Sequence, residues 1–203
     1  MGKLQLGLLS SHTGSNIQAI VQACQNSTLD AAPRVIISNN SGSNDLAYAR
    51  AEQIPHYHLS SQTHAQAVER DRAMLQVLQH HEINLVVLSG YMKKLGPLTL
   101  AHYRNRILNI HPSLLPRFGG QGMYGKRVHE AVLASGDTRT GITIHLVDAE
   151  YDQGPIVAQH ELPILPNDTA SALAQRILEQ EHLFYVETLC AISQGRLKLD
   201  QLS

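Results

Sequence analysis

The stretch Ile107-Leu108-Asn109-Ile110-His111-Pro112-Ser113-Leu114-Leu115-Pro116 decides the fold. Its first apolar residues are typical of a short buried strand, and Pro112 and Pro116 end it because a prolyl nitrogen cannot donate to a sheet ladder. Side chains alternate faces along a strand, so Asn109 and His111 point the same way. An amide can stabilise an oxyanion and an imidazole can transfer a proton, so this pair suits acyl chemistry. The alternative is a strand end whose polar residues bond only to backbone.

Short apolar runs alternate with helical patterns on both sides of this strand. This alternation predicts right-handed crossovers and an α/β fold with a parallel sheet. The expected strands cover residues 4–9, 33–38, 56–59, 84–88, 142–147 and 156–164. The expected helices start near Ile17 and cover 46–53, 63–81 and 126–135, and a long final helix has Asp168 as its N-cap.

The composition is that of one ordinary globular domain over residues 1–203. The formal net charge of -1 gives no electrostatic reason to expect a nucleic acid or a membrane as the main partner. No run of residues approaches a membrane span, and the apolar start is too short for a signal peptide. Cys24 and Cys190 are isolated, which predicts two reduced core thiols in a cytoplasmic protein. The 12 histidines form no metal-binding motif, so no metal is expected.

A small, polar turn, residues 10–16, lies between the first strand and the first helix. Strand, turn and helix in this order aim free N–H groups and the positive helix end at an anion. Gly14 lets a ligand approach the backbone, while Ser15 and Asn16 can hold a phosphate. The same two side chains can instead cap the helix, and the turn matches no Walker A or dinucleotide fingerprint.

Glu181 falls on the apolar stripe of the final helix. An inward carboxylate is costly unless it is partnered, so Glu181 is a candidate site residue. The alternative is that its side chain reaches solvent at the edge of the stripe. The apolar members of the stripe are Ala170, Leu173, Ala174, Ile177, Leu178, Tyr185 and Leu189.

Two loops follow the central strand. The Gly-rich segment Phe118–Gly125 has the length and composition of a mobile cover over a site, or equally of a plain surface loop. The acidic turn Asp148–Pro155 precedes the last strand. Acidic turns are usually only solvated, so Asp152 alone carries little weight.

Taken together, these motifs identify a family. The chain resembles, over essentially its full length, the phosphoribosylglycinamide formyltransferases, a folate-dependent branch of the formyltransferase superfamily. The resemblance implies a single-domain, Rossmann-like fold with a mainly parallel sheet and helices on both faces. The segments that carry it are Gly14-Ser15-Asn16, Leu88-Ser89-Gly90-Tyr91-Met92, Asn109-Ile110-His111-Pro112-Ser113-Leu114-Leu115-Pro116, Gly141-Ile142-Thr143-Ile144-His145, Asp152-Gln153-Gly154-Pro155 and Gln180-Glu181-His182.

The resemblance implies that Asn109, His111 and Asp152 form the catalytic site. The amine of glycinamide ribonucleotide would attack the formyl carbon of 10-formyltetrahydrofolate in purine synthesis. Asn109 and protonated His111 would stabilise the oxyanion, and Asp152 would hold His111 and assist proton transfer. No covalent enzyme intermediate and no metal is expected.

The same resemblance places both substrates. The substrate phosphate would rest on Gly14, Ser15 and Asn16, and Glu181 would bind the ribose or the glycinamide portion. No partner beyond these small molecules is implied, and the expected protein is a monomer or a homodimer. The expected folate contacts are Met92, Lys93, Leu95, Asn109, Asp148, Tyr151 and Asp152.

Three features depart from the family pattern. His12 replaces the usual first glycine of the phosphate turn, and the Phe118–Gly125 loop is longer and richer in glycine than the common form. Relatives often carry a phosphate-binding Arg near the position of Ala67, whereas here no Arg of that region precedes Arg70. The residues that could take over are His12, Lys126, Arg127 and Arg70.

Rival functions share parts of this pattern. A formyltransferase for an amino sugar nucleotide or for methionyl-tRNA uses the same chemistry, although the tRNA enzyme is expected to carry a further C-terminal domain. A formylfolate hydrolase usually has an N-terminal regulatory domain, whereas the catalytic pattern here begins at residue 4. A non-catalytic folate- or nucleotide-binding module would not need Asn109, His111 and Asp152 together.

Overall fold

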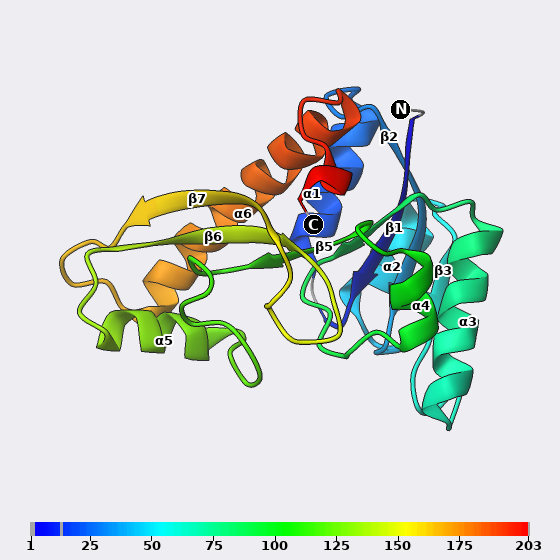
Figure 1. Ribbon diagram of the computed structural model, residues 1–203, viewed down its shortest axis with the longest axis horizontal. Coiled ribbons are helices and arrows are strands. Elements are labelled where there is room, and N and C mark those ends of the chain that lie inside the picture. Colours follow the sequence, from blue (N-terminus) through cyan, green and yellow to red (C-terminus); the bar gives the residue numbers. More distant parts are fainter. Residues whose placement is uncertain (1–2, 13, 203) are drawn as a thin grey trace.

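A computed structural model describes residues 3–12 and 14–202; Thr13, within the polar turn, lies outside them. The chain forms one seven-stranded sheet in the order β3-β2-β1-β4-β5-β6-β7, with helices around it (Figure 1). The strands are β1 Leu4–Ser10, β2 Ala31–Ser38, β3 His56–His58, β4 Leu85–Leu88, β5 Ile107–His111, β6 Arg139–Leu146 and β7 Ile156–Pro163. The helices are α1 Ser15–Gln25, α2 Asn44–Ala51, α3 Ala67–His80, α4 Pro97–His102, α5 Lys126–Ala134 and α6 Ala170–Ser193, followed by the 3-10 turn Leu199–Gln201.

The sheet is mainly parallel, as the alternation predicted. All neighbours from β3 to β5 run parallel, whereas β6 is antiparallel to both β5 and β7. Parallel neighbours need a crossover of a dozen or more residues, and the nine-residue connection 147–155 is too short to provide one. The antiparallel β6 places His145 directly opposite Asn109.

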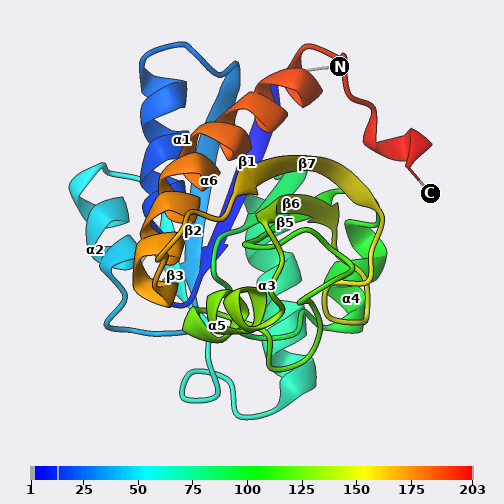
Figure 2. The same ribbon diagram turned by 90° about the vertical axis from the view of Figure 1, so that its left-hand side faces the viewer.

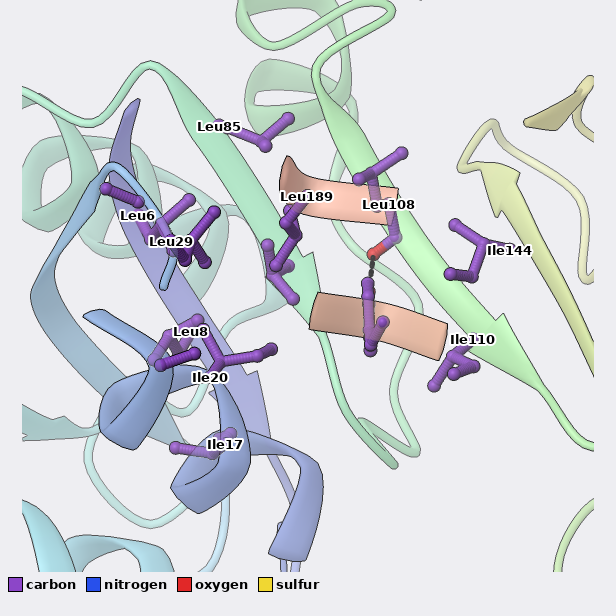
Figure 3. Packing of buried hydrophobic residues seen from close by; sticks show 14 of the residues in the cluster. Leu6, Leu8, Ile17, Ile20, Leu29, Leu85, Leu108, Ile110, Ile144 and Leu189 are labelled. Carbon is purple, nitrogen blue, oxygen red and sulfur yellow. Dashed lines mark hydrogen bonds between the residues drawn. The ribbon is translucent and has the colours of Figure 1, made fainter. Parts of the chain in front are cut away.

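Helices cover both faces of the sheet, which confirms the expected layering. The core on one face joins the sheet to α1, α5 and α6, and the core on the other face joins it to α3. α1 and α6 lie side by side in both views (Figures 1 and 2). In the first core Ile17 and Ile20 of α1 lie beside Leu8 of β1, and Leu189 of α6 lies near Leu108 (Figure 3). Such side chains contribute roughly 1.5–3 kcal/mol each when fully buried.

Two expectations about helices were wrong, and one helix was missed. The third helix begins at Ala67 rather than at residue 63, because Gln66 and Glu69 form a capping box. Thr169, not Asp168, caps α6 by accepting the Ala172 N–H at 3.1 Å. α4 was not expected at all, since six residues are too few to show a helical period.

Asp168 is used differently. Its carboxylate accepts the Leu165 N–H at 2.8 Å and pairs with Arg176 at 2.6 Å, so it secures the segment before α6. Cys24 and Cys190 are both free thiols, as expected, but each is only half-buried at the edge of the core. Within residues 3–12 and 14–202, no helix is long and apolar enough to cross a membrane.

Candidate active site

A cavity of about 1040 Å³ lies where β4 and β5 end, bounded by α1, α6 and the Gly-rich loop. Ligands of open α/β sheets usually bind at this edge, beyond the carboxyl ends of parallel strands. Asn109 and His111 line the cavity from β5, and Asp152 lines it from the loop between β6 and β7. Ser15, Asn16 and Glu181 line it as well. The structure therefore brings together residues from both halves of the sequence.

Asp152 joins the two histidines of the site. Its Oδ2 atom lies 3.5 Å from His111 Nδ1, and its Oδ1 atom lies 3.4 Å from His145 Nε2. Asp152 adopts a φ of 56°, a left-handed conformation that Asp tolerates better than most residues. A Cβ atom at Gly154 would lie 1.9 Å from the Leu146 carbonyl oxygen, so only glycine allows this tight turn. The Asp-Gln-Gly-Pro motif thus forms the tight turn that brings the Asp152 carboxylate close to His111 of β5.

His145 is a site residue to which the sequence analysis gave no role. Its Nδ1 atom lies 2.8 Å from the Leu146 carbonyl oxygen, an acceptor, so Nδ1 carries the proton. Its Nε2 atom is in hydrogen-bond contact with Asn109 Nδ2 at 3.0 Å and also lies 3.4 Å from Asp152 Oδ1. The bond fixes the Asn109 amide and leaves the second N–H of that amide free of His145. The signal lay in the motif that ends at His145, but its meaning depends on the pairing of β5 with β6.

The base of the Gly-rich loop is tied to the same residues. The Phe118 carbonyl oxygen lies 2.8 Å from His111 Nε2, and the Gly120 N–H donates to Asp152 Oδ2 at 2.9 Å. Gly120 to Gly125 line the large cavity. The loop therefore borders the cavity, and its role as a mobile cover over a site remains a prediction.

Burial disfavours the charged forms of His111 and Asp152, whereas each residue favours the charged form of the other. Burial lowers the pKa of His111, and Asp152 and the Phe118 carbonyl raise it without fully compensating. Burial alone would raise the pKa of Asp152, but His145, His111 and the Gly120 N–H together hold it below its ordinary value. Asp152 is therefore an anion beside an imidazole that is easily neutral, a pair suited to proton transfer.

In the polar turn after β1, the alternative that Ser15 or Asn16 caps the helix was wrong. The N-cap residue of α1 is Gly14, and no side chain caps this helix. The Gly14 N–H donates to the Asp45 carboxylate, at 2.8 and 2.9 Å from its two oxygens, so it is not free for a phosphate. Ser15 Oγ lies 2.8 Å from His182 Nε2, and Asn16 Nδ2 donates to Glu181 Oε2 at 2.9 Å.

Glu181 points inward, as predicted, and is only 7% exposed. Burial raises its pKa to about 7, and the hydrogen bond from Asn16 partly opposes this rise. The Oδ1 atom of Asn16 is buried and has no hydrogen-bond partner among the described residues. Asn16 Oδ1 thus lacks an internal partner, and the Glu181 carboxylate has the Asn16 amide as its side-chain partner, at the wall of the cavity.

Four basic residues were candidates for the missing phosphate-binding Arg. His12 and Lys126 line the large cavity. Arg70 lines another cavity and donates to the carbonyl oxygens of His64 and Ala65. Arg127 lies over the Tyr124 ring and is not among the residues that line either cavity.

The expected folate residues surround a smaller pocket of about 60 Å³ behind Asn109. Lys94 closes one side of it by donating to the Ala149 carbonyl oxygen at 2.9 Å. Met92 instead lines the large cavity and a neighbouring one of about 840 Å³, which also shares residues with the small pocket. The expected folate residues on the small pocket are Lys93, Leu95, Asn109, Asp148, Tyr151 and Asp152.

His129 of α5 was also missed by the sequence analysis. It is 4% exposed, lines the large cavity and leaves its Nδ1 atom without a partner in the described part of the chain. Burial, together with the nearby His111, lowers its pKa. No group of three or more His, Cys, Asp or Glu side chains among residues 3–12 and 14–202 is placed to hold a metal ion.

Comparison with known proteins places this chain in a family. A family model described as "Formyl transferase" matches residues 5–189. A phosphoribosylglycinamide formyltransferase from Haemophilus influenzae is 35% identical over 96% of this chain and 90% of its own length. The chloroplastic relative of the same name from Vigna unguiculata is 38% identical over 95% of this chain, which spans 62% of that relative.

A solved structure agrees with these matches. The crystal structure of glycinamide ribonucleotide transformylase 1 from Symbiobacterium toebii superimposes with a TM-score of 0.89 at 35% identity, covering 98% of this chain and 92% of the other. The chain therefore belongs to the formyl transferase family and, within it, to the phosphoribosylglycinamide formyltransferases.

Proposed function

We propose that the protein transfers the formyl group of 10-formyltetrahydrofolate to the amine of glycinamide ribonucleotide in purine biosynthesis. The observation that carries this proposal is the arrangement of one cavity. Asn109, His111 and Asp152 line it together with Glu181 and the first residues of α1. A small substrate with an amine at one end and a phosphate at the other fits such a cavity.

The reaction would proceed by direct attack of the amine on the formyl carbon. The tetrahedral oxyanion would be stabilised by the second N–H of the Asn109 amide and by His111 in its protonated form. The C–N bond to the folate then breaks, and the folate nitrogen takes up the proton that the amine gives up. Asp152, held as an anion, would stabilise protonated His111 and assist this transfer.

In this reaction the Nε2 atom of His111 would have to give up its present hydrogen-bond partner for the oxyanion. The Nε2 atom of His111 lies 2.8 Å from the Phe118 carbonyl oxygen. For Nε2 to reach the oxyanion, that contact must lengthen, so we infer that the base of the Gly-rich loop shifts when both substrates are bound. Gly120 donates to Asp152, so the same shift would reach the carboxylate.

The small pocket would receive the pterin ring. Its residues come from the segment after β4 and from the loop 147–152, and Asn109 and Asp152 belong to this pocket and to the large cavity. The rest of the folate would extend into the 840 Å³ cavity, where Arg70 and Lys93 can attract the carboxylates of its glutamate end. This placement puts the formyl group at the boundary between the two substrates.

The phosphate would rest on the N–H groups of Ser15 and Asn16 at the start of α1, with Glu181 accepting a ribose hydroxyl or an ammonium group. The nearest basic side chains are His12 and Lys126, which line the same cavity. We further infer a cytoplasmic protein, on the strength of its two free thiols, that acts as a monomer or a homodimer.

The test is a panel of acceptors incubated with 10-formyltetrahydrofolate, with the folate product followed by absorbance. Glycinamide ribonucleotide should be formylated, and an amino sugar nucleotide, methionyl-tRNA and water should not. Comparable turnover of another amine would replace the proposed acceptor. Folate release without any amine would indicate a hydrolase.

A further inference from the structure

Asp45 is a buried carboxylate directly behind the polar turn. It lies in the first turn of α2, its exposed fraction is 0%, and it lines none of the three cavities. Both of its oxygens approach the Gly14 nitrogen, at 2.9 and 2.8 Å. The reaction as proposed makes no use of this residue. Its position nevertheless connects α2 to the first residues of α1.

Gly14 and the Asp45 carboxylate fit closely against each other. A Cβ atom at Gly14 would lie 2.8 Å from Asp45 Oδ2 and 3.0 Å from Oδ1. A side chain larger than that of glycine at this position would therefore meet the carboxylate behind the turn. Burial raises the pKa of Asp45, and the Ser10 hydroxyl and the Gly14 N–H lower it. Gly14 and Asp45 form a matched pair.

The direction of the Gly14 N–H determines how the first turn of α1 presents its own N–H groups. Gly14 is the N-cap of α1, and the N–H groups of the first helical residues, Ser15 and Asn16, have no acceptor within the helix. With Gly14 held from behind, these groups are directed toward the cavity that Ser15 and Asn16 line. An independent feature points to a ligand there: Asn16 is only 5% exposed, and its Oδ1 atom has no partner among the described residues.

We propose that Asp45 is a positioning residue for the substrate phosphate, which holds Gly14 so that the N–H groups of Ser15 and Asn16 face the ligand. The inference rests on the proposed function and adds a residue that does not touch the substrate. Asp45 acts through Gly14 alone. Its removal should therefore weaken the binding of a phosphate and leave the folate site and the chemical step intact.

Three variants separate this role from simple stability. Asp45→Ala removes the acceptor, whereas Asp45→Asn keeps an oxygen for the Gly14 N–H and can donate to Ser10. Ser43→Ala is the matched control, because Ser43 caps the same helix by accepting the Leu46 N–H at 3.3 Å, whereas the Gly14 N–H donates to Asp45. All three should lower the denaturation midpoint or leave it unchanged, and only Asp45→Ala should alter phosphate binding.

The measurements are KM for each substrate, kcat, and calorimetric titration with inorganic phosphate and with glycinamide ribonucleotide. Asp45→Ala should raise KM and the dissociation constant for the ribonucleotide roughly tenfold, with kcat and the KM for formylfolate unchanged. Asp45→Asn and Ser43→Ala should behave like the unmodified protein. Unchanged ribonucleotide affinity in Asp45→Ala, equal losses for both substrates, or failure of Asp45→Asn to retain affinity would each overturn the proposal.

Gly14→Ala provides a second route if Asp45→Ala does not fold. The new methyl group would displace the Asp45 carboxylate and weaken ribonucleotide binding to a similar extent. In the Asp45→Ala background the methyl group has room. The double variant should therefore lose less free energy of ribonucleotide binding than the sum of the losses in the two single variants. Strict additivity would contradict the matched pair. If the unmodified protein formylates a different amine, the proposed function fails. If it formylates glycinamide ribonucleotide and Asp45→Ala binds this substrate equally well, only the inference about Asp45 is refuted.

Discussion

Asn16 Nδ2 donates a hydrogen bond of 2.9 Å to Glu181 Oε2, although the two residues are 165 positions apart in the sequence. The contact joins the first turn of α1 to the middle of α6 at the wall of the cavity that Asn109 also lines. A buried carboxylate with a single amide partner is costly unless a ligand completes its hydrogen bonding. This wall is therefore where the ribonucleotide should bind.

Glu181→Ala and Ser15→Asp should each weaken ribonucleotide binding and leave formylfolate binding nearly unchanged. The first variant removes an acceptor for a hydroxyl or ammonium group, and the second sets a negative charge against the phosphate. Calorimetric titration of each ligand separately measures both effects. Loss of folate binding with retained ribonucleotide binding would mean that the two substrates are placed the wrong way round.

The stability of the protein should depend on the ionisation of Glu181. Its pKa is about 7 in the folded protein against an ordinary value of 4.5, so between these pH values the folded state holds a proton that the unfolded state releases. The proton's contribution to the free energy of unfolding is fully present below pH 4.5 and is lost as the pH rises through 7. The free energy of unfolding falls by about 3 kcal/mol at most over this range.

Glu181→Gln removes this contribution, and Glu179→Gln, on the exposed side of the same helix, is the matched control. The free energy of unfolding is measured by urea denaturation from pH 5 to 8. As the pH rises, it should fall in the unmodified protein and in Glu179→Gln relative to its value in Glu181→Gln. Parallel curves for all three proteins would show that Glu181 does not titrate in this range.

Asn109→Ala should lower kcat by roughly 10²–10³-fold, the usual cost of one lost oxyanion donor. The amide is already oriented by His145, so the loss should appear in the chemical step rather than in substrate binding. Steady-state kinetics distinguish the two. A higher KM with unchanged kcat would make Asn109 a binding residue and refute the oxyanion role.

His145→Ala should lower kcat by less than Asn109→Ala, because His145 acts by orienting the Asn109 amide. The double variant should then be scarcely slower than Asn109→Ala alone, since the group to be oriented is gone. A double-mutant cycle on kcat measures this coupling. Fully multiplicative losses would show that His145 acts independently, for example through its contact with Asp152.

Much of the arrangement could be predicted from local patterns. The alternation in residues 107–111 predicted that Asn109 and His111 share a face, and the helical period of the last helix predicted an inward Glu181. Both depend on side-chain periodicity, which does not require the rest of the fold. The family resemblance then supplied the link to Asp152, which no spacing rule connects to β5.

The remaining features depend on contacts between distant segments. The role of His145 arises from its position opposite Asn109 in the antiparallel pair β5–β6, a register that one sequence does not reveal. The Asp45 carboxylate reaches Gly14 because α2 packs behind the polar turn, and nothing in residues 10–16 indicates it. Asp168 looked like a helix cap by residue type, but its pairing with Arg176 holds it elsewhere.

The most direct test of the central claim is the kinetics of Asp152→Asn. Asp152 joins His111 and His145 and anchors Gly120, so the isosteric amide should preserve the fold and the binding of both substrates. The account predicts a fall in kcat of roughly 10²–10⁴-fold, typical of a lost acid–base group, with ligand affinities measured by calorimetry close to those of the unmodified protein. A kcat within a few-fold of the unmodified value would remove Asp152 from the mechanism and contradict the account.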